Sequence, residues 1–287
     1  MSAIYRKELK IYFRSAFGYV MIALLLVFSG IFVTVFNMAL SYADFAYSIS
    51  TMSMVLILIV PLLTMRSIAE ERHSRTDQLL YSLPIRMSDV VLGKYFAMLT
   101  VFLIPTLITA LYPLILSTFG SISLPSAYVV LLGYFLMGAA LIALCTLISS
   151  LVENQILAAA LSIGACLLLY FMKMIAAILP ASELFSFLMC LVGALLIGAL
   201  VWKMAKSPVA GGVGALILAL PTTVIYVIKP EWFVLLVPNF FTGVSLFSRL
   251  TGSSYGYLDV GGIVFYLSFA LVCLFLTVQS MEMRRRG

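Results

Sequence analysis

Residues 17–38 read FGYVMIALLLVFSGIFVTVFNM, a run of 22 residues that contains no charged side chain. A helix of about 20 apolar residues is long enough to cross the hydrocarbon core of a bilayer. The rest of the 287-residue chain has the same character, since 64% of its residues are hydrophobic and 10% are charged. Soluble domains carry about 25% charged residues. The composition therefore argues against a soluble enzyme, a disordered chain or a nucleic-acid-binding protein, and it predicts a membrane protein.

Eight apolar runs, including this one, follow one another along the chain. They are continuously apolar, without the alternation that the strands of a membrane β-barrel require. We therefore predict an all-α polytopic integral membrane protein that forms one transmembrane domain over residues 1–287. The eight predicted spans lie near residues 17–38, 45–65, 95–117, 127–151, 156–179, 183–203, 209–228 and 259–281.

The basic residues orient these spans, because loops rich in lysine and arginine stay in the cytoplasm. With the N-terminus inside, Lys229 and Arg249 are the only two of the 17 bases that fall outside, and Lys173 lies within a span. The fourteen bases on the cytoplasmic side are Arg6, Lys7, Lys10, Arg14, Arg66, Arg72, Arg75, Arg86, Lys94, Lys203, Lys206, Arg284, Arg285 and Arg286. Both termini are therefore predicted to be cytoplasmic.

The segment Trp232–Leu250 is apolar and aromatic, but it contains a proline, an asparagine and Arg249. A ninth span here would move the basic cluster Arg284–Arg286 to the outer side and reverse the charge bias. We therefore predict an interfacial or re-entrant helix within an outer loop over residues 229–258, before the last span. A plain surface loop with aromatic anchors is the alternative.

The first residues, Ala3–Ser15, are predicted to form an amphipathic helix. Tyr5, Leu9 and Tyr12 fall on one helical face. The cations of this segment are Arg6, Lys7, Lys10 and Arg14. Such a helix is expected to lie along the inner leaflet, with its cations near anionic headgroups. A role as a topology signal alone is the alternative, and the two are compatible.

The only long inner loop, Arg66–Lys94, reads RSIAEERHSRTDQLLYSLPIRMSDVVLGK. Charged residues come first, with Glu71 and Arg75 at the spacing of a helical ion pair, and leucines follow. Pro84 is expected to end this helix, and Ser88 to cap the next one. A charged helix with leucines at its end predicts a docking surface for a soluble partner, while a solvated hairpin between two spans is the alternative.

Sequence patterns for catalysis are largely missing. No G-x-x-x-x-G-K-[ST] phosphate loop occurs, and the single histidine, His73, excludes a site with paired histidines. Residues 252–256, GSSYG, match the serine-nucleophile pattern G-x-S-x-G, but they lie in the predicted outer loop, across the bilayer from His73. We expect a glycine-rich turn there, no catalytic residue on this chain and no metal site.

Lys173 is the one clear charge inside a predicted span. Such residues are often functional, because a charge at the bilayer centre costs about 2.5–3.5 kcal/mol on insertion scales. Lys173 lies close to the outer end of its span, however, so its side chain can also extend to the interface. No acid lies well inside a span, which argues against an ion-coupled carrier.

The inner loop and three other segments have a recognisable pattern. In the loop it consists of Arg66, Ala69, Glu70, Glu71, Arg72, Thr76, Asp77, Leu79, Leu80, Pro84, Gly93 and Lys94. The other segments are Ile4–Val20, Ser149–Gln155 and residues 261–286. Together they resemble the ABC-2 family of ABC transporter permeases, and within it the branch associated with gliding motility.

The resemblance implies the membrane half of an ATP-driven transporter in a bacterial cytoplasmic membrane. Ala3–Ser15 would be its elbow helix, and Arg66–Pro84 the coupling helix that contacts a separate ATPase subunit. The residues implied in this coupling are Arg66, Glu70, Glu71, Arg72, Thr76, Asp77, Leu79 and Leu80. A second, shorter contact would include Glu153, Asn154 and Gln155. ATP and magnesium would bind to the partner, so no cofactor is expected on this chain, and two permease copies, identical or related, would pair.

The chain departs from the family pattern at one place. Typical members have six spans, whereas an additional pair is predicted here over Glu183–Ile228. Such a pair preserves the cytoplasmic C-terminus, but it puts a direct transfer of the substrate path in doubt. Outward transport is the family-level expectation. The alternatives are a membrane anchor or sensory subunit without transport and a membrane-embedded enzyme.

Overall fold

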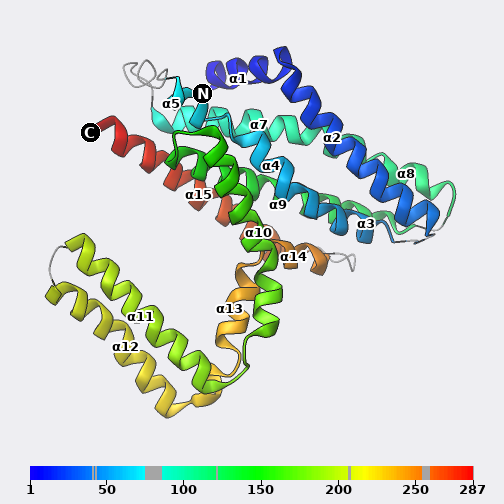
Figure 1. Cartoon of the computed structure of the whole chain (residues 1–287). Helices are drawn as coiled ribbons and strands as arrows, with labels where there is room; N and C mark the ends of the chain where they lie inside the picture. The colour runs from blue at the N-terminus through cyan, green and yellow to red at the C-terminus, as the bar shows by residue number, and fades with distance from the viewer. Residues whose placement is uncertain are drawn as a thin grey trace. The chain divides into compact units, whose positions relative to one another are not determined.

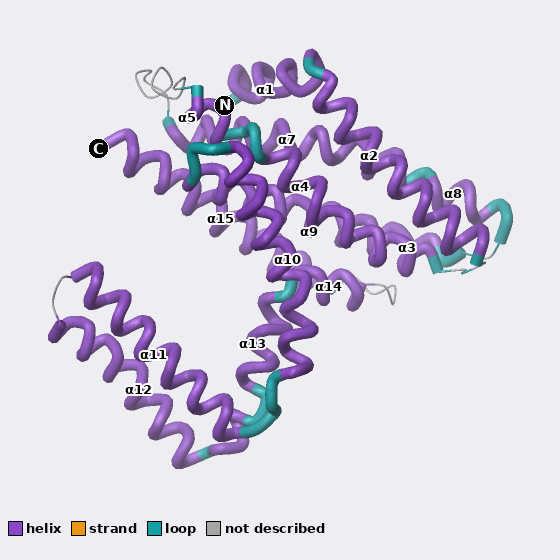
Figure 2. Tube along the Cα trace, viewed as in Figure 1, coloured by secondary structure: helices purple, strands orange, loops and turns teal. Residues whose placement is uncertain are grey.

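The computed structural model describes residues 1–40, 42, 44–74, 86–120, 122–205, 208–253 and 259–286. Within these ranges every regular element is a helix, and no strand occurs (Figure 2). The chain forms two compact units. Unit 1 comprises Met1–Tyr170 and Leu246–Gly287, and unit 2 comprises Phe171–Ser245.

Unit 1 contains most of the helices (Figure 1). In its first half these are α1 (Ser2–Arg14), α2 (Ala16–Val33), η1 (Thr34–Ala39), α3 (Phe45–Met52), η2 (Ser53–Val55), α4 (Leu56–Thr64) and α5 (Ala69–His73). They are followed by α7 (Met87–Thr109), α8 (Tyr112–Ser117), α9 (Leu124–Leu151), the first part of α10 (Gln155–Ile178), α14 (Leu246–Ser253) and α15 (Val260–Arg286). Figure 1 places both termini at the same end of unit 1 as α5, and we call this the terminal end.

Helix α9 is the centre of unit 1 and packs against α3, α4, α7, α14 and α15. Many of its buried residues are small, and they include Gly133, Gly138, Ala139, Ala140, Ala143 and Ser149. Lipid is as apolar as leucine, so membrane helices associate largely through close packing, and small residues allow it. A Cβ atom at Gly138 would overlap the ring of Phe102, which shows how closely α7 approaches α9.

Six helical segments are long and apolar enough to cross a membrane, within the residues that the structure describes. They are Ala16–Ala39, Phe45–His73, Met87–Ser117, Leu124–Leu151, Gln155–Ile178 and Val260–Arg285. These positions coincide with the first five predicted spans and the eighth. The protein is therefore a multi-pass membrane protein.

In unit 2, the predicted sixth and seventh spans correspond to α11 (Glu183–Ala205) and α12 (Pro208–Ile228), which lie side by side as a hairpin (Figure 1). The rings of Phe187 and Tyr226 stack at 4.3 Å, and Phe233 packs edge-on against both. The described apolar parts of these helices are only Glu183–Leu196 and Ala219–Ile228. The total of eight spans therefore stays a prediction.

The segment Trp232–Leu250, predicted to lie on the outer side, is not one continuous helix. After the short η3 turn (Pro230–Phe233), α13 (Leu236–Val244) has nine residues and α14 has eight. A helix that crosses a bilayer needs about 20 residues, so a ninth helical span does not form here. Of the serine-nucleophile pattern, residues 254–256 lie outside the described residues.

The prediction that Ser88 caps a helix is wrong. Helix α7 begins earlier, at Met87, and its N-cap residue Arg86 makes no capping bond through its side chain. Met87 is 1% exposed, and the Asp89 carboxylate lies 3.8 Å from the N-terminal amine. Burial of Met87 within the first turn therefore outweighs the local preference of serine for the cap position.

Candidate functional site

The N-terminal helix α1 is amphipathic, as the sequence predicts, and it packs on α2 and α7. Tyr12 is buried, and its hydroxyl donates a hydrogen bond to the Leu63 carbonyl oxygen at 3.2 Å. Burial raises the pKa of Tyr12 above its usual value, and the Glu8 and Glu70 carboxylates raise it further, although Arg66 lowers it. Tyr12 therefore remains a neutral donor that fixes α1 to the end of α4.

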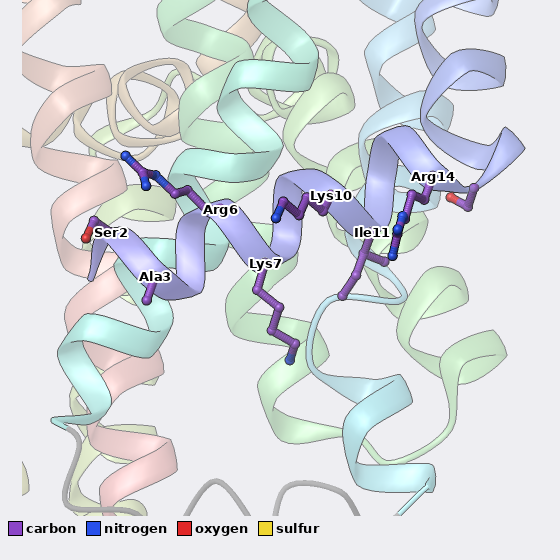
Figure 3. A pocket seen from close by; sticks show the side chains of 8 residues that line it. Ser2, Ala3, Arg6, Lys7, Lys10, Ile11 and Arg14 are labelled. Atoms are coloured by element: carbon purple, nitrogen blue, oxygen red, sulfur yellow. The ribbon is translucent and has the colours of Figure 1, made fainter.

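The exposed face of α1 is basic (Figure 3). Its cations and the half-exposed Ile11 surround an open depression of about 880 Å³. The residues that line it are Ser2, Ala3, Arg6, Lys7, Lys10, Ile11, Arg14 and Ser15. A surface with four cations beside an apolar side chain has the character of a helix that lies at a lipid headgroup layer.

Gly93 on α7 lies directly against α1. A Cβ atom at this position would be 3.0 Å from Ile4 Cγ2 and 3.3 Å from the Tyr5 backbone nitrogen, which is closer than ordinary van der Waals contact. The absence of a side chain therefore allows α1 and α7 to touch. The next residue along α7, Lys94, is thereby brought next to the buried face of α1.

Lys94 is almost fully buried, with a side chain that is 2% exposed. Its Nζ lies 3.1 Å from Glu8 Oε1 and 2.9 Å from Glu71 Oε1. It also donates a hydrogen bond to the Ser67 carbonyl oxygen at 2.7 Å. Lys7 closes the group at its exposed edge, with its Nζ 3.4 Å from Glu71 Oε1 and 3.7 Å from Glu8 Oε1.

We call Lys7, Glu8, Glu71 and Lys94 the lysine cluster. It contains two cations and two carboxylates, so it is electrically neutral. A single buried charge is costly unless an opposite charge and hydrogen bonds compensate it. The cluster meets this condition while joining three elements, because Glu8 lies on α1, Glu71 on α5 and Lys94 on α7.

The short helix α5 is fixed to α9 as well. The Ala69 backbone N–H donates a hydrogen bond to Ser149 Oγ at 3.1 Å, and this contact is buried. The neighbouring Ile68 is 2% exposed and Arg72 is 6% exposed. One side of α5 is therefore packed against the rest of unit 1.

The predicted coupling residues divide between the two sides of this segment. Glu71 and Arg72 face inward, whereas Glu70 is exposed, together with His73 and Ser74. Arg66 is also exposed, and its guanidinium lies 4.7 Å from the centre of the Phe17 ring. The other four, Thr76, Asp77, Leu79 and Leu80, lie outside the described residues.

A pocket of about 320 Å³ adjoins the lysine cluster. It lies between α1, the start of α2, α5 with the segment before it, and α7. The residues that line it are Glu8, Ile11, Tyr12, Ser15, Phe17, Arg66, Ser67, Glu70, Glu71 and Lys94. The buried charges of the cluster therefore have open space beside them.

The second predicted contact is the turn between α9 and α10, at residues 152–154. Arg284, near the end of α15, donates a hydrogen bond to the Leu151 carbonyl oxygen at 3.1 Å, and its Nη1 lies 3.6 Å from Glu153 Oε1. The Glu153 side chain is 78% exposed. Asn154 Oδ1 accepts a hydrogen bond from the Ile156 N–H at 2.8 Å, and Gln155 begins α10.

In the sequence Lys94 marks only the end of the inner loop, and the lysine cluster is not among the predicted sites. One signal could have pointed to it. Glu8 is the only acid on a helix that is otherwise basic, and it falls on the same face as the apolar Tyr12. A carboxylate in that position predicts a buried cation opposite it, because an unpaired buried charge is costly.

The remaining predicted site residue, Lys173, is exposed on α10. No group of three or more histidine, cysteine, aspartate or glutamate side chains that could hold a metal ion occurs in the described part of the chain. The predicted coupling and contact residues that the structure describes lie around α5 and at the turn at residues 152–154, both at the terminal end of unit 1. These two surfaces form the candidate site.

One known protein family matches this chain. The family described as ABC-2 family transporter protein matches residues 27–186, which is more than half of the chain. The match includes α5, Lys94 and the turn at residues 152–154, while α1 precedes it. No curated protein and no solved structure matches the chain. With six apolar helices long enough to cross a membrane, the chain belongs to the ABC-2 transporter family, as a transmembrane permease.

Proposed function

We propose that this chain is the permease subunit of an ABC transporter and that a separate ATPase subunit docks on the exposed side of α5. Membership of the family implies an ABC ATPase partner in general. The main observation behind the proposal is that α5 has one buried side and one exposed side. Glu71 and Arg72 are packed inward, while His73 and Ser74 are exposed, and Glu70 is exposed at the edge of the pocket beside the lysine cluster. An anchored helix with an exposed polar side can receive a force from a partner and pass it on.

The proposed mechanism follows from these anchors. Closure of the ATPase subunits around ATP would displace α5, and α5 is connected to α1, α7 and α9. The bundle would then shift between two arrangements and move a hydrophobic or amphipathic substrate outward. ATP and magnesium would bind to the ATPase, because this sequence has no phosphate loop. The turn at residues 152–154 would be a second, smaller contact with the same partner.

The same proposal includes the membrane in which the chain lies and its pairing with a second permease. The basic face of α1 would lie on anionic lipid at the inner leaflet of a bacterial cytoplasmic membrane. A second permease copy, identical or related, would complete the transporter. The similarity to the gliding-motility branch of the family supports this placement but rests on the sequence patterns alone.

The prediction of eight spans, with both termini in the cytoplasm, can be tested by thiol labelling. If α11 and α12 cross the membrane, the thiol of Ser207→Cys reacts with an impermeant maleimide from the cytoplasmic side only. If they do not cross, the same thiol reacts from the outside. The thiol of Ser254→Cys is expected to react from the outside in both cases, so it serves as the internal control.

The functional proposal is tested by purifying the tagged chain from native membranes under mild conditions. We expect a soluble ATPase to copurify, with ATPase activity in the reconstituted complex. His73→Glu, at the exposed end of α5, is expected to weaken the complex without changing the melting temperature of the permease. A chain that purifies without any ATPase would contradict the proposal. A complex that forms but shows no transport-linked ATPase activity would favour the anchor or sensory alternative.

A further inference from the structure

We propose that Lys94 is a positioning residue that holds α1 and α5 together on α7, so that these three helices move as one body. Its consequence for transport rests on the proposed function, because only a docked ATPase would load α5. The mechanical part of the inference concerns this chain alone. It can be measured without a partner and without a substrate.

The three contacts of Lys94 come from two distant segments of the chain, α1 and the segment of residues 67–71 that leads into α5. A lysine ammonium has three N–H donors, and here they meet Glu8 on α1, Glu71 on α5 and the Ser67 carbonyl oxygen ahead of α5. No donor is left for water, in agreement with a side chain that is 2% exposed. Loss of this one side chain would remove the charged contacts of α7 with both α1 and α5, while the packing of α1 on α7 at Gly93 and the contact between the Tyr5 and Thr100 hydroxyls, 3.0 Å apart, would remain.

A simpler role would be charge compensation. Lys94 neutralises two carboxylates that are mostly buried, at 7% exposure for Glu8 and 18% for Glu71. Without Lys94 the cation of the cluster that remains beside these carboxylates is Lys7, whose side chain is 54% exposed. If Lys94 only balances charge, any electrically neutral set of side chains can replace the cluster. If Lys94 also ties the helices together, a cation at position 94 is required.

The two roles separate in a double variant. Lys94→Met leaves two carboxylates and one cation, so the cluster becomes negative. Lys94→Met combined with Glu8→Gln leaves the pair of Lys7 and Glu71, which is neutral again but connects α1 only to α5. Lys94→Arg is the conservative control, because a guanidinium can reach both carboxylates and the adjacent pocket of about 320 Å³ has room for it.

The experiment measures the distance between spin labels attached to Asp89→Cys on α7 and His73→Cys on α5. Neither residue belongs to the lysine cluster, and His73 is exposed. The four native cysteines are replaced by serine or alanine, and the full chain is placed in vesicles of phosphatidylethanolamine and phosphatidylglycerol. Melting temperatures of the same variants report whether each one folds.

We expect one narrow distance distribution for the unsubstituted cluster and for Lys94→Arg. Lys94→Met is expected to lower the melting temperature and to lose the narrow distribution. The double variant is expected to recover the melting temperature but not the narrow distribution. A narrow distribution in the double variant would overturn the inference, since charge balance would then be sufficient. A broad distribution with Lys94 in place would overturn it as well.

The result is independent of whether an ATPase binds. If no ATPase copurifies with the chain, the proposed function fails while the distance distributions still decide the role of Lys94. If an ATPase does bind, the double variant is expected to keep the complex and lose its transport-linked stimulation. Stimulation that survives the loss of the narrow distribution would overturn the consequence drawn for transport.

Discussion

The two surfaces proposed to meet an ATPase, α5 and the turn at residues 152–154, are built in opposite ways. On α5 the anchoring groups are buried, with Glu71 on Lys94 and the Ala69 N–H on Ser149. At the turn the anchor is Arg284, which is 40% exposed and meets a Glu153 side chain that is 78% exposed. Both surfaces are polar and belong to unit 1, yet only the first is packed into it.

This difference indicates which contact can carry force. Exposed ion pairs contribute roughly 0–1 kcal/mol because water and salt screen them, so the turn can change position at little cost. Buried charged hydrogen bonds are far more expensive to break, so α5 cannot move without its neighbours. We infer that α5 transmits displacement and that the turn adapts to it. Four predictions test this contrast, in order of decreasing effect.

The largest effect is expected from charge reversal. Glu71→Lys places a third cation beside Lys7 and Lys94 in a mostly buried position and should destabilise the protein by about 3–5 kcal/mol. Glu153→Lys, the matched change at the turn, should cost less than about 1 kcal/mol. Unfolding of the solubilised chain measures both. Similar losses for the two variants would remove the distinction between the surfaces.

The second prediction concerns two neighbouring serines that are both fully buried. Ser149→Ala leaves the Ala69 N–H without its acceptor and should cost about 1–3 kcal/mol. Ser150 donates a hydrogen bond to the Leu147 carbonyl oxygen of its own helix, so Ser150→Ala leaves no backbone N–H without an acceptor and should cost less than Ser149→Ala. If Ser150→Ala were the more harmful change, α5 would not be anchored through Ser149.

The third prediction concerns the packing of α1, which supports the lysine cluster. Gly93→Ala brings a Cβ atom to 3.0 Å from Ile4 Cγ2, and overpacking of this kind should cost about 1 kcal/mol after the gain in helix propensity. A Cβ atom at Gly164 on α10 would meet open space, with no neighbouring atom within 4 Å. Gly164→Ala should therefore be neutral or stabilising. The two melting temperatures should shift in opposite directions or by clearly different amounts.

The smallest effect on stability is expected at the turn itself. Arg284→Ala removes the hydrogen bond to Leu151 and the ion pair with Glu153, at a cost of roughly 0–1 kcal/mol. Hydrogen exchange should nevertheless become faster at the amides of residues 152–156, because the local opening free energy falls. Unchanged exchange at these amides would show that Arg284 does not hold the turn.

The sequence predicts the helices well and their contacts poorly. Apolar runs identify spans such as 127–151 to within a few residues, because the length needed to cross a bilayer leaves little freedom. The inward face of α1, including Tyr12, also follows from helical spacing. The start of α7 is different, since burial of Met87 decides it rather than the serine that follows.

The lysine cluster shows why the rest could not be predicted. Lys94 and Glu8 are 86 residues apart in the chain, and only the packing of α1 on α7 brings them together. That packing depends on a glycine whose role is invisible until its neighbours are known. The same applies to α5, where Glu70 and Glu71 are adjacent and equally charged, but Glu71 contacts the buried Lys94 whereas Glu70 is exposed at the edge of the pocket.

The charge of Lys94 has one role during membrane insertion and another in the folded protein. During insertion, before helices have met, Lys94 counts among the bases that are predicted to keep their loops in the cytoplasm. In the folded protein the Lys94 side chain is 2% exposed and its ammonium faces two carboxylates, so it no longer attracts anionic lipid. The bases counted in the sequence therefore overstate the free positive charge of the finished surface. The same cation first helps to place the chain and later helps to hold it together.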